Sequence, residues 1–359
     1  MRNNKKIAVI GGGSTGHATA ADLTLAGFEI TLFEELQFRE RLKPAQSKGG
    51  IHLKGAARQG FAKINEITDD IEMALQHAQI IIVAVHAHRH EDIAEICAPY
   101  LKDTHTFVIT PGNVGSLVMT KKLQDLGVVN KPVIAEVESS FYACRLTGLA
   151  EATVLLPPRP KYIAAFPANH TDKAIEALHG VYETMPATNI IEAALNSPNV
   201  DTHLQGSLLN TGAIEKADGK YALYAQGLTP AVIKCIEAFH QERAALFKAL
   251  GYEDRAKPES IKKAAIPDEH PELDLLITAS GPTSMRHRYV DENARVGVSL
   301  IISLGEMLGI PTPLARAMVQ LASTMNDFDY LKHGRTLENL GLSNLTVGDL
   351  NRCLKEGSL

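Results

Sequence analysis

The sequence contains no long apolar run and no cluster of cysteines. No stretch approaches the about 18 apolar residues that span a bilayer, and the apolar run Ile7–Ile10 near the start is too short for a secretory signal. We therefore expect a soluble, cytoplasmic protein that does not contact a membrane. Neither a disulfide framework nor a zinc site is expected, because the four cysteines lie far apart without a C-x-x-C pair: Cys97, Cys144, Cys235 and Cys353.

The chain also lacks an excess of positive charge. It has 36 lysines and arginines against 41 aspartates and glutamates, for a formal net charge of −5. A protein that binds nucleic acid non-specifically needs a cationic surface that releases counterions from phosphates, so we expect no nucleic-acid partner. Apolar residues make up 45% of the chain and charged residues 21%, which is usual for a folded globular protein.

The 359 residues are enough for two domains, and the first 140 alternate short apolar runs with segments of helical spacing. Strands that are apolar throughout and separated by helices are typical of a parallel sheet covered on both faces. The expected strands are Lys6–Ile10, Glu29–Phe33, Ile80–Val85, Thr106–Thr110 and Pro132–Glu136, and the expected helices are Thr15–Ala26, Asp70–Gln76, His90–Leu101 and Gly115–Leu126. Ala152–Leu156 and Tyr162–Phe166 flank the proline-rich segment Pro157–Pro160, so we expect this pair of strands at a sheet edge.

Long helical segments dominate from about residue 191 onwards. They are Asn199–Ala217, Thr229–Leu250, Asn293–Leu308, Pro313–Asn326 and Val347–Leu354. We therefore predict an α/β fold, with a doubly wound parallel sheet over residues 1–190 and an all-helical domain over residues 191–359. The cleft between the two domains is the expected substrate site.

A glycine-rich turn joins the first strand to the first helix. Gly11, Gly13 and Gly16 fit the pattern G-x-G-x-x-G, in which the glycines permit a tight turn, approach to a pyrophosphate and close packing of helix on strand. The helix start, with Ser14 and Thr15, would present free N–H groups to the phosphates. This pattern predicts that the N-terminal domain is a Rossmann domain that binds a dinucleotide.

Glu34 ends the second strand, where a carboxylate can bind the ribose 2′-hydroxyl of NAD and repel the 2′-phosphate of NADP. Three cations follow, and they leave NADP open as a second cofactor: Arg39, Arg41 and Lys43. Ligands bind at the carboxyl ends of parallel strands, so the loops after the next strands should complete the cofactor pocket. These loops contain Val85, Pro111 and Gly112.

Three alternating histidines, His86, His88 and His90, follow the strand that ends at Val85. A metal site is conceivable for this pattern. No acidic or cysteine cluster is evidently paired with the histidines, so we predict a solvated loop near the cofactor and no metal.

A polar stripe lies along the first long helix of the C-terminal domain. Its members recur at spacings of four, four and three residues, which places them on one helical face: Asn199, His203, Ser207 and Asn210. Such a stripe suits a helix that lines a wet cleft or, equally, a solvated helix face. Histidine titrates near neutrality, which makes His203 the candidate for proton transfer coupled to hydride transfer.

A turn rich in charge precedes the helix that starts near Asn293. Arg288 could bind a substrate carboxylate through two hydrogen bonds, and a nearby acid could orient His203. Asp291 is a candidate for that acid, although it could equally be a charge at a helix N-terminus.

Together these segments resemble the opine dehydrogenase family (octopine and nopaline dehydrogenases), and especially its bacterial carboxyethyl-norvaline dehydrogenases. The resemblance covers nearly the whole chain. The matching segments are Gly11–Gly16, Thr110–Gly112, Glu136 with Cys144-Arg145, Asn199 with His203, Gly227–Pro230, Gly281-Pro282, Arg288-Tyr289, Pro311–Pro313 and Gly334–Leu342.

The resemblance implies NAD or NADP as cofactor and a reductive condensation of an amino acid with an α-keto acid, commonly pyruvate, through an imine. It further implies a catalytic role for His203 and carboxylate binding by Arg288, with Asn199 and Glu136 as further substrate-binding candidates. Similar enzymes dimerise, so a homodimer is expected. The family has a supporting aspartate where this chain has Asn293, and proline where it has Leu204, so the group that supports His203 stays open among residues 291–293.

Two alternatives to an opine dehydrogenase remain. A 2-keto-acid reductase with the same two-domain plan would need no amine pocket. A non-catalytic NAD-binding sensor would use the cofactor to change conformation without turnover, but it would leave His203 and Arg288 without an evident purpose.

Overall fold

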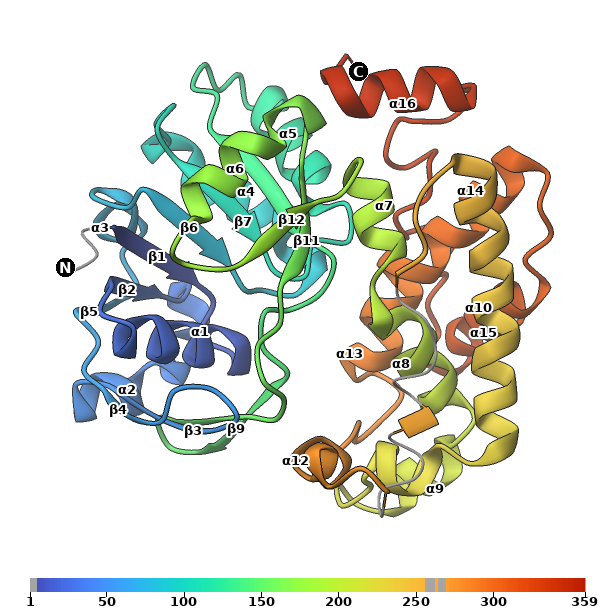
Figure 1. The fold of residues 1–359 in the computed structure, drawn as a ribbon, viewed down its shortest axis with the longest axis horizontal. Coiled ribbons are helices and arrows are strands. Elements are labelled where there is room, and N and C mark those ends of the chain that lie inside the picture. The colour runs from blue at the N-terminus through green and yellow to red at the C-terminus, as the bar shows by residue number, and fades with distance from the viewer. Residues whose placement is uncertain (1–4, 256–261, 264–268, 359) are drawn as a thin grey trace. The chain divides into compact units, whose positions relative to one another are not determined.

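The computed structural model describes residues 5–255, 262–263 and 269–358, so the first four residues of the charged start lie outside the described part. The chain divides into two units, Met1–Ile190 and Ile191–Leu359 (Figure 1). The first unit contains sheets and helices, and the second contains helices and no strand among its described residues.

The apolar runs of the first unit form one sheet with the order β12-β11-β8-β7-β6-β1-β2-β5 among the described residues. Its parallel centre consists of β1 (Lys6–Ile10), β2 (Glu29–Phe33), β6 (Ile80–Val83), β7 (Thr106–Ile109) and β8 (Val133–Val137). The outer strands are β5 (Glu66–Thr68), β11 (Lys161–Ala165), which runs antiparallel to β8, and β12 (Thr184–Pro186). The strand order reverses at β1, and sheets of this kind bind ligands at the carboxyl ends of the strands at that point.

Helices cover both faces of this sheet because its central strands are apolar on both sides (Figure 1). Ile7 and Val9 of β1 pack on the side of α1 (Ser14–Leu25) and α6 (Thr171–Leu178). The intervening residues of β1, Ala8 and Ile10, pack on the opposite side, with α3 (Ile71–Leu75), α4 (His90–Cys97) and α5 (Gly115–Asp125). The predicted doubly wound fold is confirmed, with the central strands within two residues of their expected ends.

A second, smaller sheet corrects one expectation. β10 (Glu151–Val154) lies between β3 (Ile51–Gly55) and β9 (Cys144–Gly148), with β4 (Gly60–Ala62) beyond β3, whereas β11 lies inside the main sheet. The expectation that these two strands lie at a sheet edge was therefore wrong. The prolines stand between the strands rather than within either one, so they remove no hydrogen-bond donor from a ladder.

The helical unit is organised around α8 (Pro198–Leu208). This helix packs against α10 (Pro230–Leu250), α13 (Arg288–Glu292), the π-helical turn Asn293–Val298 and α15 (Pro313–Asn326). The expected helix Asn199–Ala217 is interrupted, because α8 ends at Leu208 and α9 (Thr211–Lys216) starts afterwards. The other described α-helices of the chain are α2 (Lys43–Lys48), α7 (Ile190–Leu195), α12 (Asp274–Ile277), α14 (Ser299–Leu308) and α16 (Val347–Glu356).

A buried charge cluster joins α8 to α10. The Asp201 carboxylate accepts a hydrogen bond from Arg243 at 2.7 Å and lies 3.2 Å from Nδ1 of His240. Nε2 of His240 lies 3.1 Å from the Asp254 carboxylate. Asp201 and Arg243 are almost fully buried. Buried charges are stable only with their partners in place, so this cluster sets how α8 lies on α10.

Replacement of Asp201 by Asn should destabilise the helical unit strongly. The variant would leave Arg243 buried without its anion, which typically costs about 3–5 kcal/mol. Urea unfolding followed by circular dichroism measures the change. Asp327→Asn is the matched control, because Asp327 is exposed with φ near +49°, a conformation that asparagine tolerates. If Asp201→Asn lowers the free energy of unfolding no more than this control does, the cluster does not have this role.

Candidate active site

The glycine-rich turn between β1 and α1 has a conformation that requires glycine at two positions. A Cβ on Gly16 would lie 1.6 Å from the carbonyl oxygen of Gly11, so α1 packs on the end of β1 at a distance that only glycine allows. Gly11 has a φ of +115°, which also favours glycine. A Cβ on Gly13, by contrast, would meet no atom within 4 Å.

The open side of Gly13 lies at the N-terminus of α1, where this structure fits a pyrophosphate. Gly13 is the N-cap residue, no side chain caps the helix, and its first turn carries no acidic residue. Among the described residues, no side chain therefore caps the first N–H groups of α1, which stay available to a ligand. Nδ1 of the buried His17 lies 3.2 Å from the Gly13 carbonyl oxygen, and burial lowers the pKa of this imidazole.

Ser14 and Thr15 lie in this first turn, as predicted. The Ser14 hydroxyl accepts a hydrogen bond from the Leu146 backbone N–H at 3.2 Å, which ties the turn to β9. Val85 lies beside the loop, since its Cγ1 would be 3.1 Å from a Cβ on Gly11. These residues surround the glycine loop, and their predicted contact with the cofactor stays a prediction.

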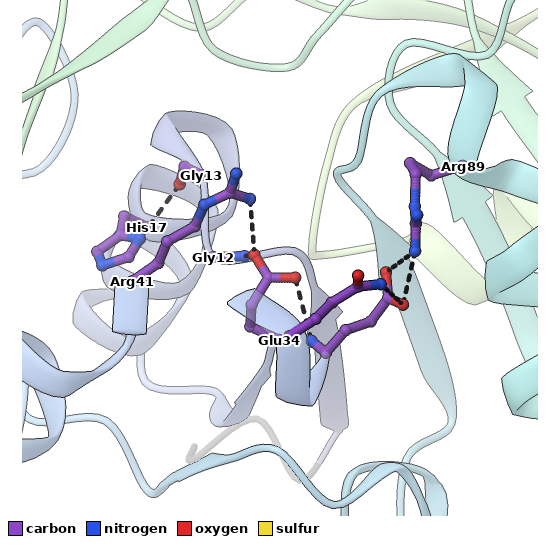
Figure 2. A network of polar contacts seen from close by, with 8 residues as sticks. Gly12, Gly13, His17, Glu34, Arg41 and Arg89 are labelled. Carbon is purple, nitrogen blue, oxygen red and sulfur yellow. Dashed lines mark hydrogen bonds and ion pairs between the residues drawn. The ribbon is translucent and has the colours of Figure 1, made fainter. Parts of the chain in front are cut away.

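Glu34 lies beside the glycine loop, at the end of β2 (Figure 2). Its buried carboxylate accepts hydrogen bonds from the backbone N–H of Gly12 at 2.9 Å and from that of Glu35 at 3.1 Å. Arg41 lies 3.2 Å from the same carboxylate. A negative charge therefore does stand where the sequence predicts the ribose to bind, and an arginine accompanies it.

The loop with Pro111 and Gly112 is held by a second buried carboxylate, that of Glu136 on β8. It accepts hydrogen bonds from the backbone N–H of Val114 at 2.7 Å and from the N–H and hydroxyl of Ser116 at 2.8 and 2.6 Å. A Cβ on Gly112 would lie 2.3 Å from Cβ of Glu136, so the loop passes against this side chain. Val114 has φ of +65°, a conformation that β-branched residues rarely adopt, and these hydrogen bonds hold it there.

Glu136 was expected to bind substrate. Its side chain is fully buried and already accepts three hydrogen bonds. These hydrogen bonds hold the loop that carries Pro111 and Gly112, and substrate binding by Glu136 stays a prediction.

The three alternating histidines do not lie in one environment. His86 and His88 are exposed and stack on each other with ring centroids 5.6 Å apart, whereas His90 is fully buried, packed on Gly115 of α5. No group of three or more His, Cys, Asp or Glu could hold a metal ion within residues 5–255, 262–263 and 269–358. Over the same residues, no helix is long and apolar enough to cross a membrane.

In the helical unit, two aromatic side chains contact the imidazole of His203. Its ring stacks on that of Tyr289 with centroids 3.6 Å apart and an interplanar angle of 8°. Its Nε2 lies 3.3 Å from the hydroxyl oxygen of Tyr224, which belongs to the π-helical turn Leu223–Gly227. The stack fixes the plane of the imidazole, and the phenol fixes the direction of one ring nitrogen.

Arg288 begins α13, next to Tyr289, and its side chain is partly exposed. Its Nη1 lies 3.7 Å from the Glu292 carboxylate, and its guanidinium carbon lies 5.3 Å from the centroid of the Tyr289 ring. The same tyrosine therefore contacts both His203 and Arg288. A guanidinium with one distant ion pair keeps N–H groups for a carboxylate ligand.

Asp291 and Asn293, the residues predicted to orient His203, make hydrogen bonds to other groups. Asp291 accepts hydrogen bonds from the Tyr330 hydroxyl at 2.9 Å and from Arg295 at 3.2 Å. Burial and the Asp291 charge raise the pKa of Tyr330 to about 12, so its hydroxyl remains a donor. The Asn293 amide donates to the backbone carbonyls of Arg288 and Tyr289, both at 3.3 Å.

The predicted polar stripe is only partly on one helix. Asn199 lies one turn before His203 on α8, is partly buried, and makes no side-chain hydrogen bond to the described residues. Ser207 is fully buried. Asn210 lies beyond the helix end, where its amide donates to the Gly206 and Gly227 carbonyls and accepts from Tyr221.

The sequence did not predict the positions of several polar groups. Tyr224 and Tyr289 contact His203 from distant segments, and no local spacing indicates this. Lys161 lies at the start of β11, where it donates to the Ser139 hydroxyl at 2.8 Å, and burial lowers the pKa of its amine. The sequence indicates this buried amine only through a lysine that starts a strand directly after the proline-rich segment.

Comparisons with known proteins agree with these two units. A family model described as "NAD/NADP octopine/nopaline dehydrogenase, alpha-helical domain" matches residues 186–326, and one described as "NADP oxidoreductase coenzyme F420-dependent" matches residues 6–113. An opine dehydrogenase from Arthrobacter sp. (strain 1C) is 29% identical, over 99% of this chain and 100% of its own length. The chain is therefore similar to opine dehydrogenases over its whole length. The family resemblance that the sequence indicated is confirmed.

Solved structures of opine dehydrogenases share the fold over the whole length. Octopine dehydrogenase with NADH and either L-arginine or pyruvate has a TM-score of 0.70 at 16% identity, over 99% of both chains. Yersinopine dehydrogenase with bound NADP⁺ has a TM-score of 0.65 at 16% identity, again over 99% of both chains. His203 and Arg288 of this chain both fall within the segment matched by the octopine/nopaline dehydrogenase model.

The Gly13→Ala variant should weaken cofactor binding without changing the stability of the fold. The added methyl group meets no protein atom, so urea unfolding should change by no more than about 0.5 kcal/mol. It would occupy the space next to the N–H groups of α1, so the affinity for NADH should fall by about tenfold or more in a fluorescence titration. Gly212→Ala, also at an open position, is the control. Unchanged NADH binding by Gly13→Ala would rule out this cradle.

Proposed function

We propose that this chain is an NAD(P)-dependent opine dehydrogenase, which joins an amino acid to an α-keto acid by reduction of their imine. The observation that carries this proposal is the shared contact of Tyr289 with His203 and Arg288, within the segment that matches the octopine/nopaline dehydrogenase model. The same chain holds a pyrophosphate cradle at the start of α1.

The reaction begins when the amine condenses with the keto carbonyl and releases water. Reduced NAD(P), when bound, supplies the hydride that the imine carbon accepts. Arg288 binds a substrate carboxylate through its free N–H groups, and the Asn199 amide, one turn from His203, is available to orient the same substrate. His203 exchanges the proton that the carbonyl and amine stages require.

Tyr224 positions His203 for this proton exchange. Its hydroxyl lies at hydrogen-bond distance from Nε2 and can donate to the neutral imidazole, which leaves the ring proton on Nδ1. Asp291 and Asn293 hold the surrounding segment through their own contacts with Tyr330, Arg295 and the backbone of α13. In this proposal they shape the site, and a phenol takes the orienting role.

The substrate classes follow from the relatives. The octopine dehydrogenase structures hold L-arginine or pyruvate, which supports an amino acid and a short α-keto acid as substrates here, with pyruvate as the first candidate. Structures of relatives carry NADH or NADP⁺, which supports this class of cofactor. The homodimer and the cytoplasmic location stay predictions.

A substrate matrix tests the function directly. Loss of NADH absorbance is followed with pyruvate and related keto acids, each with and without a panel of amino acids, and with NADPH in parallel. We expect turnover that requires both an amino acid and a keto acid. Turnover with a keto acid alone would show a simple reductase. Tight NADH binding with no turnover in any combination would favour the sensor and contradict the proposal.

Two variants test the roles at His203. His203→Ala should lower kcat by about 10²–10⁴-fold while NADH affinity is unchanged, because general acid–base groups contribute this much to rate. Tyr224→Phe should lower kcat by about tenfold, with little change in KM, because one hydrogen bond to the base is lost. The phenol favours the neutral imidazole, so its removal should also move the acidic limb of the kcat–pH profile to higher pH.

Tyr221→Phe is the matched control for Tyr224→Phe. Tyr221 precedes the same π-helical turn, but its hydroxyl donates to Asn210 at 2.9 Å. This control should leave the pH profile in place. If Tyr224→Phe also leaves it in place, Tyr224 does not act through His203.

A further inference from the structure

The amine of Lys161 is buried beside a neutral group. The residue is only 8% exposed, and its Nζ donates a hydrogen bond to the Ser139 hydroxyl oxygen at 2.8 Å. Within residues 5–255, 262–263 and 269–358, this amine forms no ion pair with a carboxylate. Lysines are rarely buried without an anion beside them, so the burial of this one asks for a reason.

The surroundings of Lys161 favour its neutral form. Burial lowers the pKa of the amine; the charge of Glu138 raises it and the charge of Arg159 lowers it. A lowered pKa increases the fraction of the amine that carries a lone pair at neutral pH, and this lone pair is what a nucleophile needs. The bond to Ser139 uses one N–H of the amine, so the lone pair remains available to an electrophile.

Lys161 and Ser139 stand opposite each other at the carboxyl end of β8. The strands β8 and β11 run antiparallel, with Val137 opposite Ile163. Two residues beyond this pair, the same register brings Ser139 opposite Lys161, and their hydrogen bond continues the contact between the two strands. The amine is therefore held at a fixed place by the main sheet.

The loop with Gly112 contacts the chain before and after Ser139. The Gly112 N–H donates to the Val137 carbonyl at 3.0 Å, and the Phe141 N–H donates to the Thr110 hydroxyl at 3.2 Å. Sheets of this kind bind their ligands at the carboxyl ends of the strands, and β8 lies beyond β6 and β7 on one side of β1. The buried amine therefore lies at the ligand-binding edge of the sheet.

We propose that Lys161 forms an imine with the α-keto acid and passes it to the amino acid. This inference rests on the proposed function, because that function supplies both substrates. Lysines in desolvated sites are common covalent catalysts for carbonyl substrates, and they replace one difficult step by two easier ones. The Ser139 hydroxyl accepts from the amine and keeps its own hydrogen for the carbonyl oxygen of the keto acid.

The steps balance in atoms and protons. The lone pair of Lys161 attacks the keto carbon, and one proton moves from the nitrogen to the oxygen to give a carbinolamine. The hydroxyl group leaves as water with a proton from solvent, which gives a protonated imine on Lys161. The neutral amine of the amino acid adds to the same carbon, transfers one proton to the Lys161 nitrogen and expels Lys161 as a neutral amine. The protonated substrate imine that remains is the species that hydride reduces.

Chemical trapping in the full wild-type chain tests for the lysine imine directly. The chain is incubated at neutral pH with pyruvate and sodium cyanoborohydride, without NADH or an amino acid, and its peptides are analysed by mass spectrometry. We expect one carboxyethyl group per chain, on Lys161, at saturating pyruvate. Lys131 and Lys173 are exposed and serve as internal controls. Each should carry less than about a tenth of this label, because nothing desolvates its amine.

Lys161→Met removes the amine and keeps a buried chain of similar length. Opine synthesis should fall by about a hundredfold or more, whereas NADH affinity in isothermal titration should change by less than about twofold. Urea unfolding should show no loss of stability, because methionine brings no polar group into the buried site.

Ser139→Ala removes the hydrogen-bond partner of the amine. Trapping on Lys161 should slow by about tenfold, because the amine loses one orienting hydrogen bond. Ser140→Ala is the matched control, since the Ser140 hydroxyl accepts from the Tyr142 N–H instead. This control should leave the trapping rate in place. Equal rates in the two serine variants would overturn the role of Ser139.

The outcomes separate this inference from the proposed function. If wild-type Lys161 carries no label at saturating pyruvate, or no more than the exposed lysines do, the inference is overturned even if opine synthesis is observed. Opine synthesis by Lys161→Met at the wild-type rate also overturns it. A chain that is labelled on Lys161 but forms no opine with any pair of substrates supports the imine and overturns the proposed function.

Discussion

The contact between Gly16 and the backbone of Gly11 is the constraint on which the N-terminal unit depends. Any side chain at Gly16 would overlap the carbonyl oxygen of Gly11, so helix α1 can meet the end of β1 only because this side chain is missing. The close approach sets α1 against the sheet and the second sheet against α1. It also leaves the helix N-terminus open beside Gly13, which is what a pyrophosphate requires.

Buried carboxylates hold the functional segments around this frame. Glu34 binds the Gly12 backbone, Glu136 binds the backbone of the loop at Val114 and Ser116, and Asp201 binds Arg243 behind the helix of His203. A buried carboxylate is stable only when donors surround it, so each one also dictates the position of its donors. The same chemistry therefore positions the glycine loop, the loop of Pro111 and the helix of His203.

The site of the helical unit is built from aromatic contacts. Tyr289 stacks on His203 and contacts Arg288, and Tyr224 meets the imidazole from another segment. Asp291 is bonded to Tyr330 and Arg295. A histidine oriented by a phenol and a ring stack differs in charge from one oriented by a carboxylate, because neither aromatic group brings a full negative charge to an imidazolium. This difference makes the pH dependence of the reaction informative about the site.

The sequence by itself determined the parts that depend on local order. The glycine spacing, the apolar strands and the position of Glu34 after β2 follow from residues close in the chain, so these were predicted almost to the residue. The tertiary structure decided what distant segments do together. Residues far apart in sequence come together around Glu136, Asp291 and His203. No periodicity in the sequence indicates such contacts. The separation of β10 and β11 into two sheets has the same reason, because hydrogen-bond pairing between strands is chosen by the fold as a whole.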